Sequence, residues 1–132
     1  MIVAREHIPV IWRDIEAHVD AALEKAHGEF DRYDVLQYLM AGEFQLWVPD
    51  DLSGICVTRV LSYPRYTAVR VVLFAGKGAL GTWAVPMIER VEEWARGMGC
   101  KRLEEMGRDG WAKVGQKHGW QEASRLMVKE LI

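Results

Sequence analysis

The spacing of apolar residues predicts two helices in the first third of the chain. Between residues 11 and 26 apolar side chains recur every three or four positions, as on one face of an amphipathic helix. Gly28 follows where a helix commonly ends on a left-handed glycine. A second helix is predicted over residues 33–40, with Asp31 as its N-cap.

The pattern then changes to the period of two that is typical of strands. Residues 44–48 and 55–61 predict a hairpin, because the segment 49–51, Pro-Asp-Asp, lies between them. Residues 68–74 are apolar on both faces and rich in β-branched side chains, which predicts a strand in the interior of the sheet.

A glycine-rich break at residues 76–81 precedes a third predicted helix, with Thr82 as its N-cap and an end near Met98. Its predicted buried stripe consists of Ala84, Ile88, Val91, Ala95 and Met98. The remaining predicted elements are a strand at residues 101–105, a short helix at 111–118 and a last strand at 124–131. We therefore predict one α/β domain over residues 1–132, whose mixed sheet joins an antiparallel meander to a right-handed β-α-β unit.

Three segments of the chain are similar to the GNAT (GCN5-related N-acetyltransferase) superfamily. They are residues 34–48, residues 88–103 and the Gly-Trp step at 119–120. This resemblance implies the GNAT fold, in which residues 1–5 would supply a first strand. It also implies that acetyl-CoA, if it binds, lies between the central strand and the helix that follows. The residues that would hold it are Phe74, Gly76, Lys77, Gly78, Gly81 and Thr82.

The chain departs from the family pattern at the loop that receives the CoA pyrophosphate. Members usually carry Arg/Gln-x-x-Gly-x-Gly/Ala there, since backbone N–H groups and the helix N-terminus hold the phosphates. Aligned on Gly76 and Gly78, the sequence has Ala75 at the Arg/Gln position and Leu80 at the last small position. Aligned on the helix instead, Trp83 falls within the motif. Either bulky side chain would obstruct the close backbone approach that glycine permits.

No catalytic residue can be assigned from the sequence. Many family members protonate the leaving thiolate with a Tyr, and Gly115 stands at that position, while Arg108 replaces a common Asn. Glu43 and His118 are candidates for acid-base work, but a solvated carboxylate and a structural histidine are the favoured interpretations. The histidines and cysteines show no ligand spacing, so no metal site is predicted.

A narrower resemblance concerns GNAT-fold proteins encoded by tailed bacteriophages. The residues that carry it are Trp94-Ala95-Arg96 and the motif Gly107-Arg108-Asp109-Gly110-Trp111. In that group the fold occurs in small uncharacterised or virion-associated proteins. The resemblance implies a location in the host cytoplasm or in the virion, and it implies no demonstrated chemistry.

Composition and charge exclude several classes of partner. The formal net charge is −2, so the chain has no overall attraction for a phosphate backbone and nucleic acid is not an expected partner. No apolar stretch is long enough to span a membrane, and a cytoplasmic protein is expected. Six tryptophans exceed the needs of a small core, which predicts a protein partner or a homo-oligomer through exposed tryptophans, Trp83 and Trp111 above all.

Three functional hypotheses remain open at this point. The first is a diverged, non-catalytic GNAT-fold protein that acts through protein contacts. The second is an acyl-CoA-dependent N-acyltransferase with a non-standard site. The third is a small anion- or nucleotide-binding module, because Gly76, Gly78 and Gly81 match the bare dinucleotide fingerprint.

Overall fold

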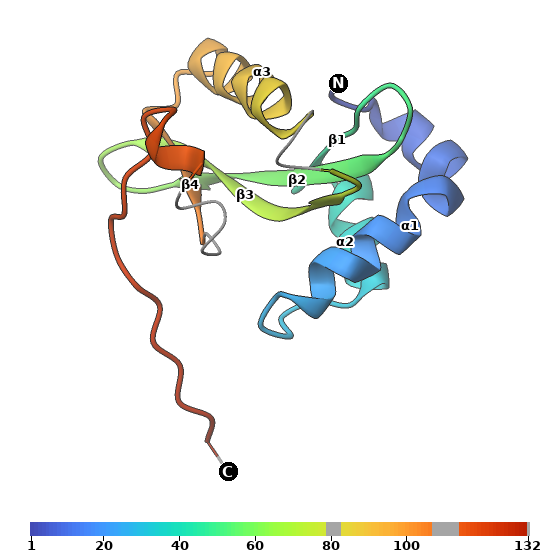
Figure 1. Cartoon of the computed structure of the whole chain (residues 1–132), viewed down its shortest axis with the longest axis horizontal. Coiled ribbons are helices and arrows are strands. Elements are labelled where there is room, and N and C mark those ends of the chain that lie inside the picture. Colours follow the sequence, from blue (N-terminus) through green and yellow to red (C-terminus); the bar gives the residue numbers. More distant parts are fainter. Residues whose placement is uncertain (79–82, 107–113, 132) are drawn as a thin grey trace.

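The computed structural model describes residues 1–78, 83–106 and 114–131. A short 3₁₀ turn, η1 (Arg5–His7), leads into the helices and strands (Figure 1). In chain order these are α1 (Ile8–Glu24), α2 (Arg32–Met40), β1 (Gln45–Trp47), β2 (Gly54–Ser62), β3 (Thr67–Gly76), α3 (Ala84–Gly97) and β4 (Arg102–Glu105).

The strands form one four-stranded sheet in the order β1-β2-β3-β4. The pairs β1–β2 and β2–β3 are antiparallel, and β3–β4 is parallel. This confirms the mixed sheet, with a meander followed by a β-α-β unit whose crossover contains α3. It also confirms that β3 is an interior strand.

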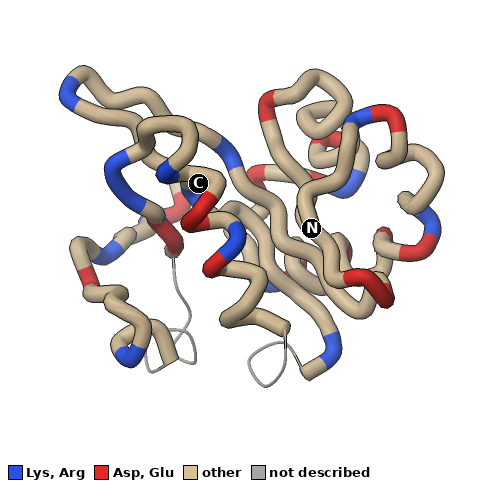
Figure 2. The backbone as a smooth tube through the Cα atoms, turned by 90° about the horizontal axis from the view of Figure 1, so that it is seen from above, with Lys and Arg blue, Asp and Glu red and all other residues tan. Residues whose placement is uncertain are grey.

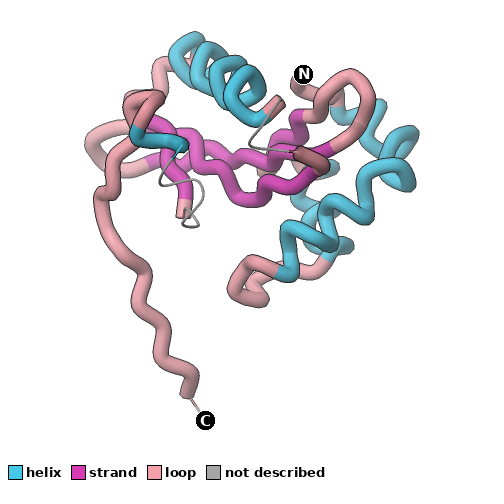
Figure 3. The backbone as a smooth tube through the Cα atoms, in the orientation of Figure 1, coloured by secondary structure: helices cyan, strands magenta, loops and turns pink. Residues whose placement is uncertain are grey.

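The two faces of the sheet are covered by different helices and carry separate cores (Figures 1 and 3). Helices α1 and α2 pack on one face, where the buried residues include Ile15, Val19, Leu39, Ile55, Val57 and Leu73. Helix α3 packs on the other, where they include Trp47, Cys56, Val69, Val71, Ile88 and Val91. Burial raises the pKa of the Cys56 thiol, which lies within this second core.

Helix α2 begins at the predicted N-cap. The side chain of Asp31 accepts a hydrogen bond from the backbone N–H of Asp34 at 2.9 Å. The side chain of Asp34 accepts one from the N–H of Asp31 at 3.0 Å. This capping box satisfies two donors of the first turn, which explains why the short helix starts where the sequence predicts.

An extra residue in β3 changes which side chains face which helix. The pairing shifts between Val57, which lies opposite Leu73, and Thr58, which lies opposite Val71. Val72 is therefore a bulge residue. Because side chains alternate along a strand, one inserted residue reverses the faces beyond it. Val71 packs under α3, whereas Leu73 packs against α1 and α2.

The N-terminal residues replace the predicted first strand with a single bridge. Ile2 pairs with Trp47 in antiparallel fashion. The N–H of Val3 donates to the carbonyl of Leu46 at 2.8 Å, and the N–H of Val48 donates to that of Met1 at 2.9 Å. This short contact lies along the outer edge of β1.

Two predictions near the C-terminal end are wrong. Residues 124–131 form no strand in the structure, because nothing in the described chain pairs with them, and they extend into solvent. Met98 is not in the buried stripe of α3, because the helix ends at Gly97 and Met98 is 51% exposed. Met87 takes its place in the second core.

The predicted N-cap Thr82 lies outside the described residues. Part of the predicted helix at 111–118 also lies outside them, and in its described part residues 114–116 are helical.

A buried hydrogen-bond chain between β1 and β2 supplies a stability test. The Trp47 indole N–H donates to Oγ1 of Thr58 at 3.0 Å, and this hydroxyl donates to Oε1 of Gln45 at 2.9 Å. Thr58→Val keeps the shape of the side chain but removes its hydroxyl, so the Trp47 N–H and Oε1 of Gln45 both lose their hydrogen-bond partner. The free energy of unfolding should therefore fall by roughly 1–2 kcal/mol. Urea denaturation measures this free energy. The control Thr67→Val, at the half-buried start of β3, should change stability by less than about 0.5 kcal/mol. Equal losses in both variants would contradict a role for the chain of hydrogen bonds.

Candidate functional site

Strands β3 and β4 pair along only part of their length. The last register pair is Val71 with Glu105, and β3 continues beyond it to Gly76. The pairing of β3 with β4 thus covers Ala68 to Val71 of β3. The bulge at Val72 lies at this divergence. The two parallel strands therefore form a fork that opens toward the N-terminal end of α3.

An aromatic side chain fills the region between the end of β3 and the start of α3. The rings of Trp83 and Phe74 stack with centroids 4.8 Å apart and planes 9° from parallel. The Trp83 indole N–H donates to the backbone carbonyl of Lys77 at 3.1 Å. A Cβ on Gly76 would lie 2.5 Å from the Trp83 ring and 2.6 Å from the Cα of Gly54. Gly54 and Gly76 therefore leave space for the Trp83 indole because they have no side chain, and they allow β2 and β3 to lie close together beneath it.

The structure brings together part of the predicted cofactor site. Phe74, Gly76 and Lys77 lie beside one another, and all three are in contact with or close to Trp83, which occupies the space next to them. The N–H of Lys77 donates to the carbonyl of Ser53 at 3.0 Å, so this amide already has a partner. Gly78 has a φ of +58°, the left-handed turn conformation that glycine adopts readily. Gly81 and Thr82 lie outside the described residues.

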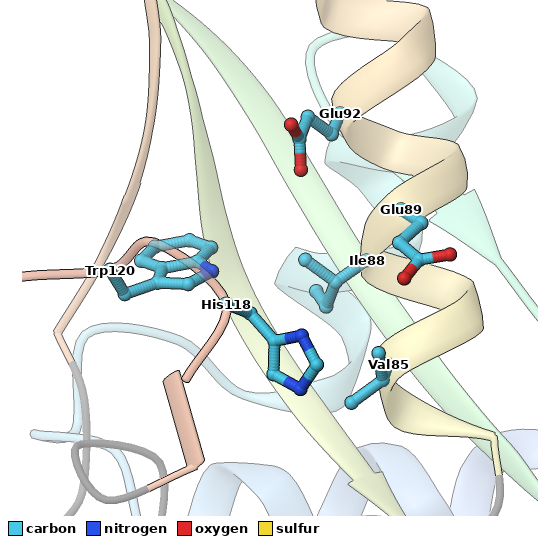
Figure 4. A pocket seen from close by; sticks show the side chains of 6 residues that line it. All are labelled: Val85, Ile88, Glu89, Glu92, His118 and Trp120. Carbon is cyan, nitrogen blue, oxygen red and sulfur yellow. The ribbon is translucent and has the colours of Figure 1, made fainter. Parts of the chain in front are cut away.

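A cavity of about 210 Å³ lies next to α3 (Figure 4). On one side are side chains of α3, and on the other are two residues of the segment that follows β4. The lining residues are Val85, Ile88, Glu89, Glu92, His118 and Trp120. Its acidic groups are the carboxylates of Glu89 and Glu92, the second of which is paired with Arg96. An acidic wall over an apolar floor suits a neutral or cationic group better than a phosphate.

Gly115 contributes backbone geometry to this cavity. Gly115 is buried, and its carbonyl accepts hydrogen bonds from the N–H of His118 at 2.8 Å and of Trp120 at 3.0 Å. The resulting turn directs both side chains toward α3 (Figure 4). A glycine there has no phenol to give a proton. His118 lines this cavity.

Sequence reasoning did not identify Glu89, Glu92 and Trp120 as neighbours. Glu89 and Glu92 are spaced by three on the polar side of α3, which is the ordinary pattern of a solvated helix face. Their meeting with Trp120 depends on the path of the chain after β4. No local signal in the sequence carries that information.

The other candidates do not form a reaction centre. Glu43 is exposed in the turn before β1. Among the described residues no group of three or more His, Cys, Asp or Glu side chains is arranged to hold a metal ion. Cationic and anionic positions are interspersed along the described backbone (Figure 2). Arg108 and Lys113 lie outside the described residues.

A polar cluster around the carboxylate of Glu104 lies where β3 and β4 are paired, which is the closed end of the fork. The carboxylate of Glu104 on β4 accepts hydrogen bonds from Arg70 and from Tyr63, both at 2.9 Å. Arg102 donates to its other oxygen at 2.9 Å and lies over the ring of Tyr66, 5.1 Å from the centroid. Burial raises the pKa of Glu104, but the hydrogen bonds from Arg102, Arg70 and Tyr63 outweigh it, so the pKa lies below the usual value. The carboxylate of Glu104 is thus bound by three side chains of the sheet region.

The fold is that of the GNAT acetyltransferases. The chain superposes over its whole length on solved structures of this class. One is a GCN5-related N-acetyltransferase from Ralstonia eutropha JMP134, with a TM-score of 0.69, 14% identity and coverage of 99% of this chain and 96% of that one. Another is the aminoglycoside acetyltransferase HMB0005 from an uncultured soil metagenomic sample, with a TM-score of 0.73, 13% identity and coverage of 100% and 97%.

A third similar structure is a predicted acetyltransferase with acetyl-CoA from Clostridium acetobutylicum. Its TM-score is 0.69 at 11% identity, with coverage of 98% of this chain and 94% of that one. No family model matches the sequence, and no curated protein matches it. At these identities the likeness establishes the fold alone. No helix in the described part of the chain is long and apolar enough to cross a membrane.

The engagement of Glu104 predicts a pH-dependent contribution to stability. A carboxyl with a lowered folded-state pKa stabilises the fold above its unfolded pKa of about 4.3, and this stabilisation is lost as the pH falls through the folded-state value. Glu104→Gln should therefore lower the free energy of unfolding at pH 7 by roughly 1–2 kcal/mol, since the partner cations are half exposed. The deficit should shrink below about pH 4.

Urea denaturation at pH 7 and pH 3 measures this deficit. Glu93→Gln, an exposed position on α3, is the matched control and should show no deficit at either pH. A Glu104→Gln deficit of the same size at both pH values would contradict the electrostatic origin.

Proposed function

We propose that this chain is a diverged GNAT-fold protein that does not use acyl-CoA and acts through protein contacts. The observation that carries the proposal is the position of Trp83. Its indole stacks on Phe74 and bonds the carbonyl of Lys77, where the family resemblance implies that a pyrophosphate would approach the backbone. A bulky ring there excludes the close approach that phosphate binding needs.

Three further features support the proposal. Pro86, in the first turn of α3, has no N–H to offer an anion. The backbone N–H of Lys77 is bonded to Ser53. The cavity beside α3 carries the carboxylates of Glu89 and Glu92, which would repel the phosphates of CoA. The residues therefore do not fit acyl-CoA.

The proposal includes an origin among the GNAT-like proteins of tailed bacteriophages. Its support is the resemblance of Trp94-Ala95-Arg96 and of residues 107–111. In this reading the chain works in the host cytoplasm or as part of the virion. The chain would then keep the acyltransferase scaffold as a platform for a protein partner.

One observation favours a second candidate function, an acyl-CoA-dependent N-acyltransferase with a non-standard site. The register pairs of β3 and β4 end at Val71 and Glu105, and an edge of β3 continues beyond them to Gly76. An extended ligand can bind such an edge through backbone hydrogen bonds. In this alternative the Trp83 ring would have to leave its stack on Phe74 before the cofactor could enter.

Calorimetry with acetyl-CoA distinguishes the two candidates. We expect no saturable heat for the native chain at ligand concentrations up to about 1 mM. Trp83→Ala removes the obstructing ring and should give weak binding in the millimolar range. Trp94→Ala is the matched control, because Trp94 is also a half-buried tryptophan, but it lies within α3 and packs on Trp47 in the second core. It should lower stability without creating binding.

Saturable binding of acetyl-CoA to the native chain, with a Kd well below 1 mM, would overturn the proposal. Transfer of the acetyl group to an amine in the same samples would establish the enzyme instead. Binding by Trp83→Ala and Trp94→Ala alike would show that loosening of the fold, and not removal of the ring, admits the ligand.

A further inference from the structure

Two arginines lie directly opposite each other on one face of the sheet. Arg59 of β2 pairs with Arg70 of β3 in the antiparallel register, so both side chains lie on the same face. This is the face that carries α1 and α2, because the Arg59 guanidinium lies over the ring of Phe44, a residue of the core beneath these helices. Like charges in directly opposite positions destabilise a sheet. The pair therefore favours an anion beside it.

Within the described residues, a single carboxylate pairs with the arginines of this face. Glu104 of β4 lies beside Arg70 in the parallel register, and it forms ion pairs with Arg70 and Arg102. Glu105 alternates to the opposite face, where its charge adds to the effect of burial in raising the pKa of the Cys56 thiol. Glu104 therefore serves the arginines of β3 and β4, and β2 contributes a further positive charge.

The N–H groups of Arg59 can reach a ligand. Its guanidinium has no hydrogen bond or ion pair in the described part of the chain, and the residue is exposed. The group lies over the Phe44 ring, 5.9 Å from the centroid, and Arg102 lies over the ring of Tyr66. Contact with a ring leaves the edge of a guanidinium open, and this edge matches the two oxygens of a carboxylate.

Helices α1 and α2 leave this part of the sheet accessible. In Figure 1 both helices lie on the side of the sheet nearer to β1, away from β4. The side chains of Arg70 and Arg102 are 34% and 49% exposed. The described tryptophans, in contrast, are buried or half-buried. The surface formed by Arg59, Arg70 and Arg102, the arginine face, is therefore better suited to an outside contact than the described tryptophans are.

We propose that the arginine face binds an acidic segment of a protein partner, with Arg59 as its main anchor. This inference rests on the proposed function, because it names the surface through which the protein contacts are made. Carboxylates of the partner accept hydrogen bonds from Arg59 and offset its repulsion with Arg70. Pairs of this kind, in which one guanidinium binds both oxygens of a carboxylate, are among the strongest hydrogen-bonded contacts of side chains.

The charge of the whole chain favours a short acidic segment over a nucleic acid. A phosphate backbone extends well beyond three arginines, and the chain as a whole carries 19 acidic and 17 basic side chains, which gives a long polyanion no net attraction. A short peptide needs only the local excess of positive charge. The same excess repels an ammonium group, so the arginine face does not suit an amine.

Calorimetry of the full chain with a blocked hexaglutamate peptide tests the proposal. We expect saturable binding with a Kd of roughly 0.1–1 mM at low salt, and a lower affinity as salt screens the charges. The uncharged hexaglutamine peptide should not bind. Arg59→Gln should weaken hexaglutamate binding at least roughly 10-fold, because it removes the main anchor. Arg59→Lys keeps the charge but loses the planar pair of donors, so it should recover only part of this loss.

Arg96→Gln is the matched control, since Arg96 carries the same charge on α3, over the opposite face. It should change the affinity less than about 2-fold. No saturable binding of hexaglutamate to the native chain would overturn the proposal, as would equal losses in Arg59→Gln and Arg96→Gln. Tighter binding of a hexathymidylate oligonucleotide than of hexaglutamate would overturn it too, because the arginine face would then select a phosphate backbone.

The arginine face and the proposed function can fail separately. Saturable binding of acetyl-CoA to the native chain would overturn the proposed function whatever the peptide does. Failure of hexaglutamate to bind, with no binding of acetyl-CoA either, would remove the arginine face as a docking site and leave the argument from Trp83 unchanged.

Discussion

A single inserted residue in the longest strand determines the arrangement of the candidate site. The bulge at Val72 reverses the alternation of β3, so that Val71 packs under α3 and Leu73 packs against α1 and α2. Phe74 then returns to the α3 side and meets Trp83. Pairing with β4 ends next to the same bulge, at Val71. The end of the β3–β4 pairing and the aromatic stack on β3 therefore both lie next to this bulge.

The closed and open ends of the fork are stabilised by different interactions. At the closed end, Arg70 of β3 and Arg102 of β4 share the carboxylate of Glu104, which fixes the two strands side by side. Toward the end of β3, the Trp83 indole stacks on Phe74 and lies close to Gly54 and Gly76, so it covers the ends of β2 and β3. Hydrogen bonds and ion pairs thus fix β4 beside β3 at one end, whereas aromatic packing covers β2 and β3 at the other. The sheet keeps the geometry of the GNAT fold, with a bulky ring beside the turn that follows β3.

The sequence predicted the parts of the fold that depend on local rules. The capping box at Asp31 and the β-branched run of β3 are local signals, and the structure has these elements where they were expected. The bulge at Val72 could not be predicted, because it depends on a register between two strands. The meeting of Trp83 with Phe74 follows from that register. The sequence predicted a steric conflict between Trp83 and the family motif, but it did not predict the stacking of Trp83 on Phe74.

The wrong strand at residues 124–131 has a different cause from the other errors. Its alternating apolar residues do carry the pattern of a strand, but a strand exists only with a partner beside it. Residues 121–131 leave the body of the molecule without helix or sheet, so in the described chain no strand lies beside them. The alternation of apolar side chains is a local property of the sequence. The neighbouring strand that must supply the hydrogen bonds is not local, and the pattern alone cannot provide it.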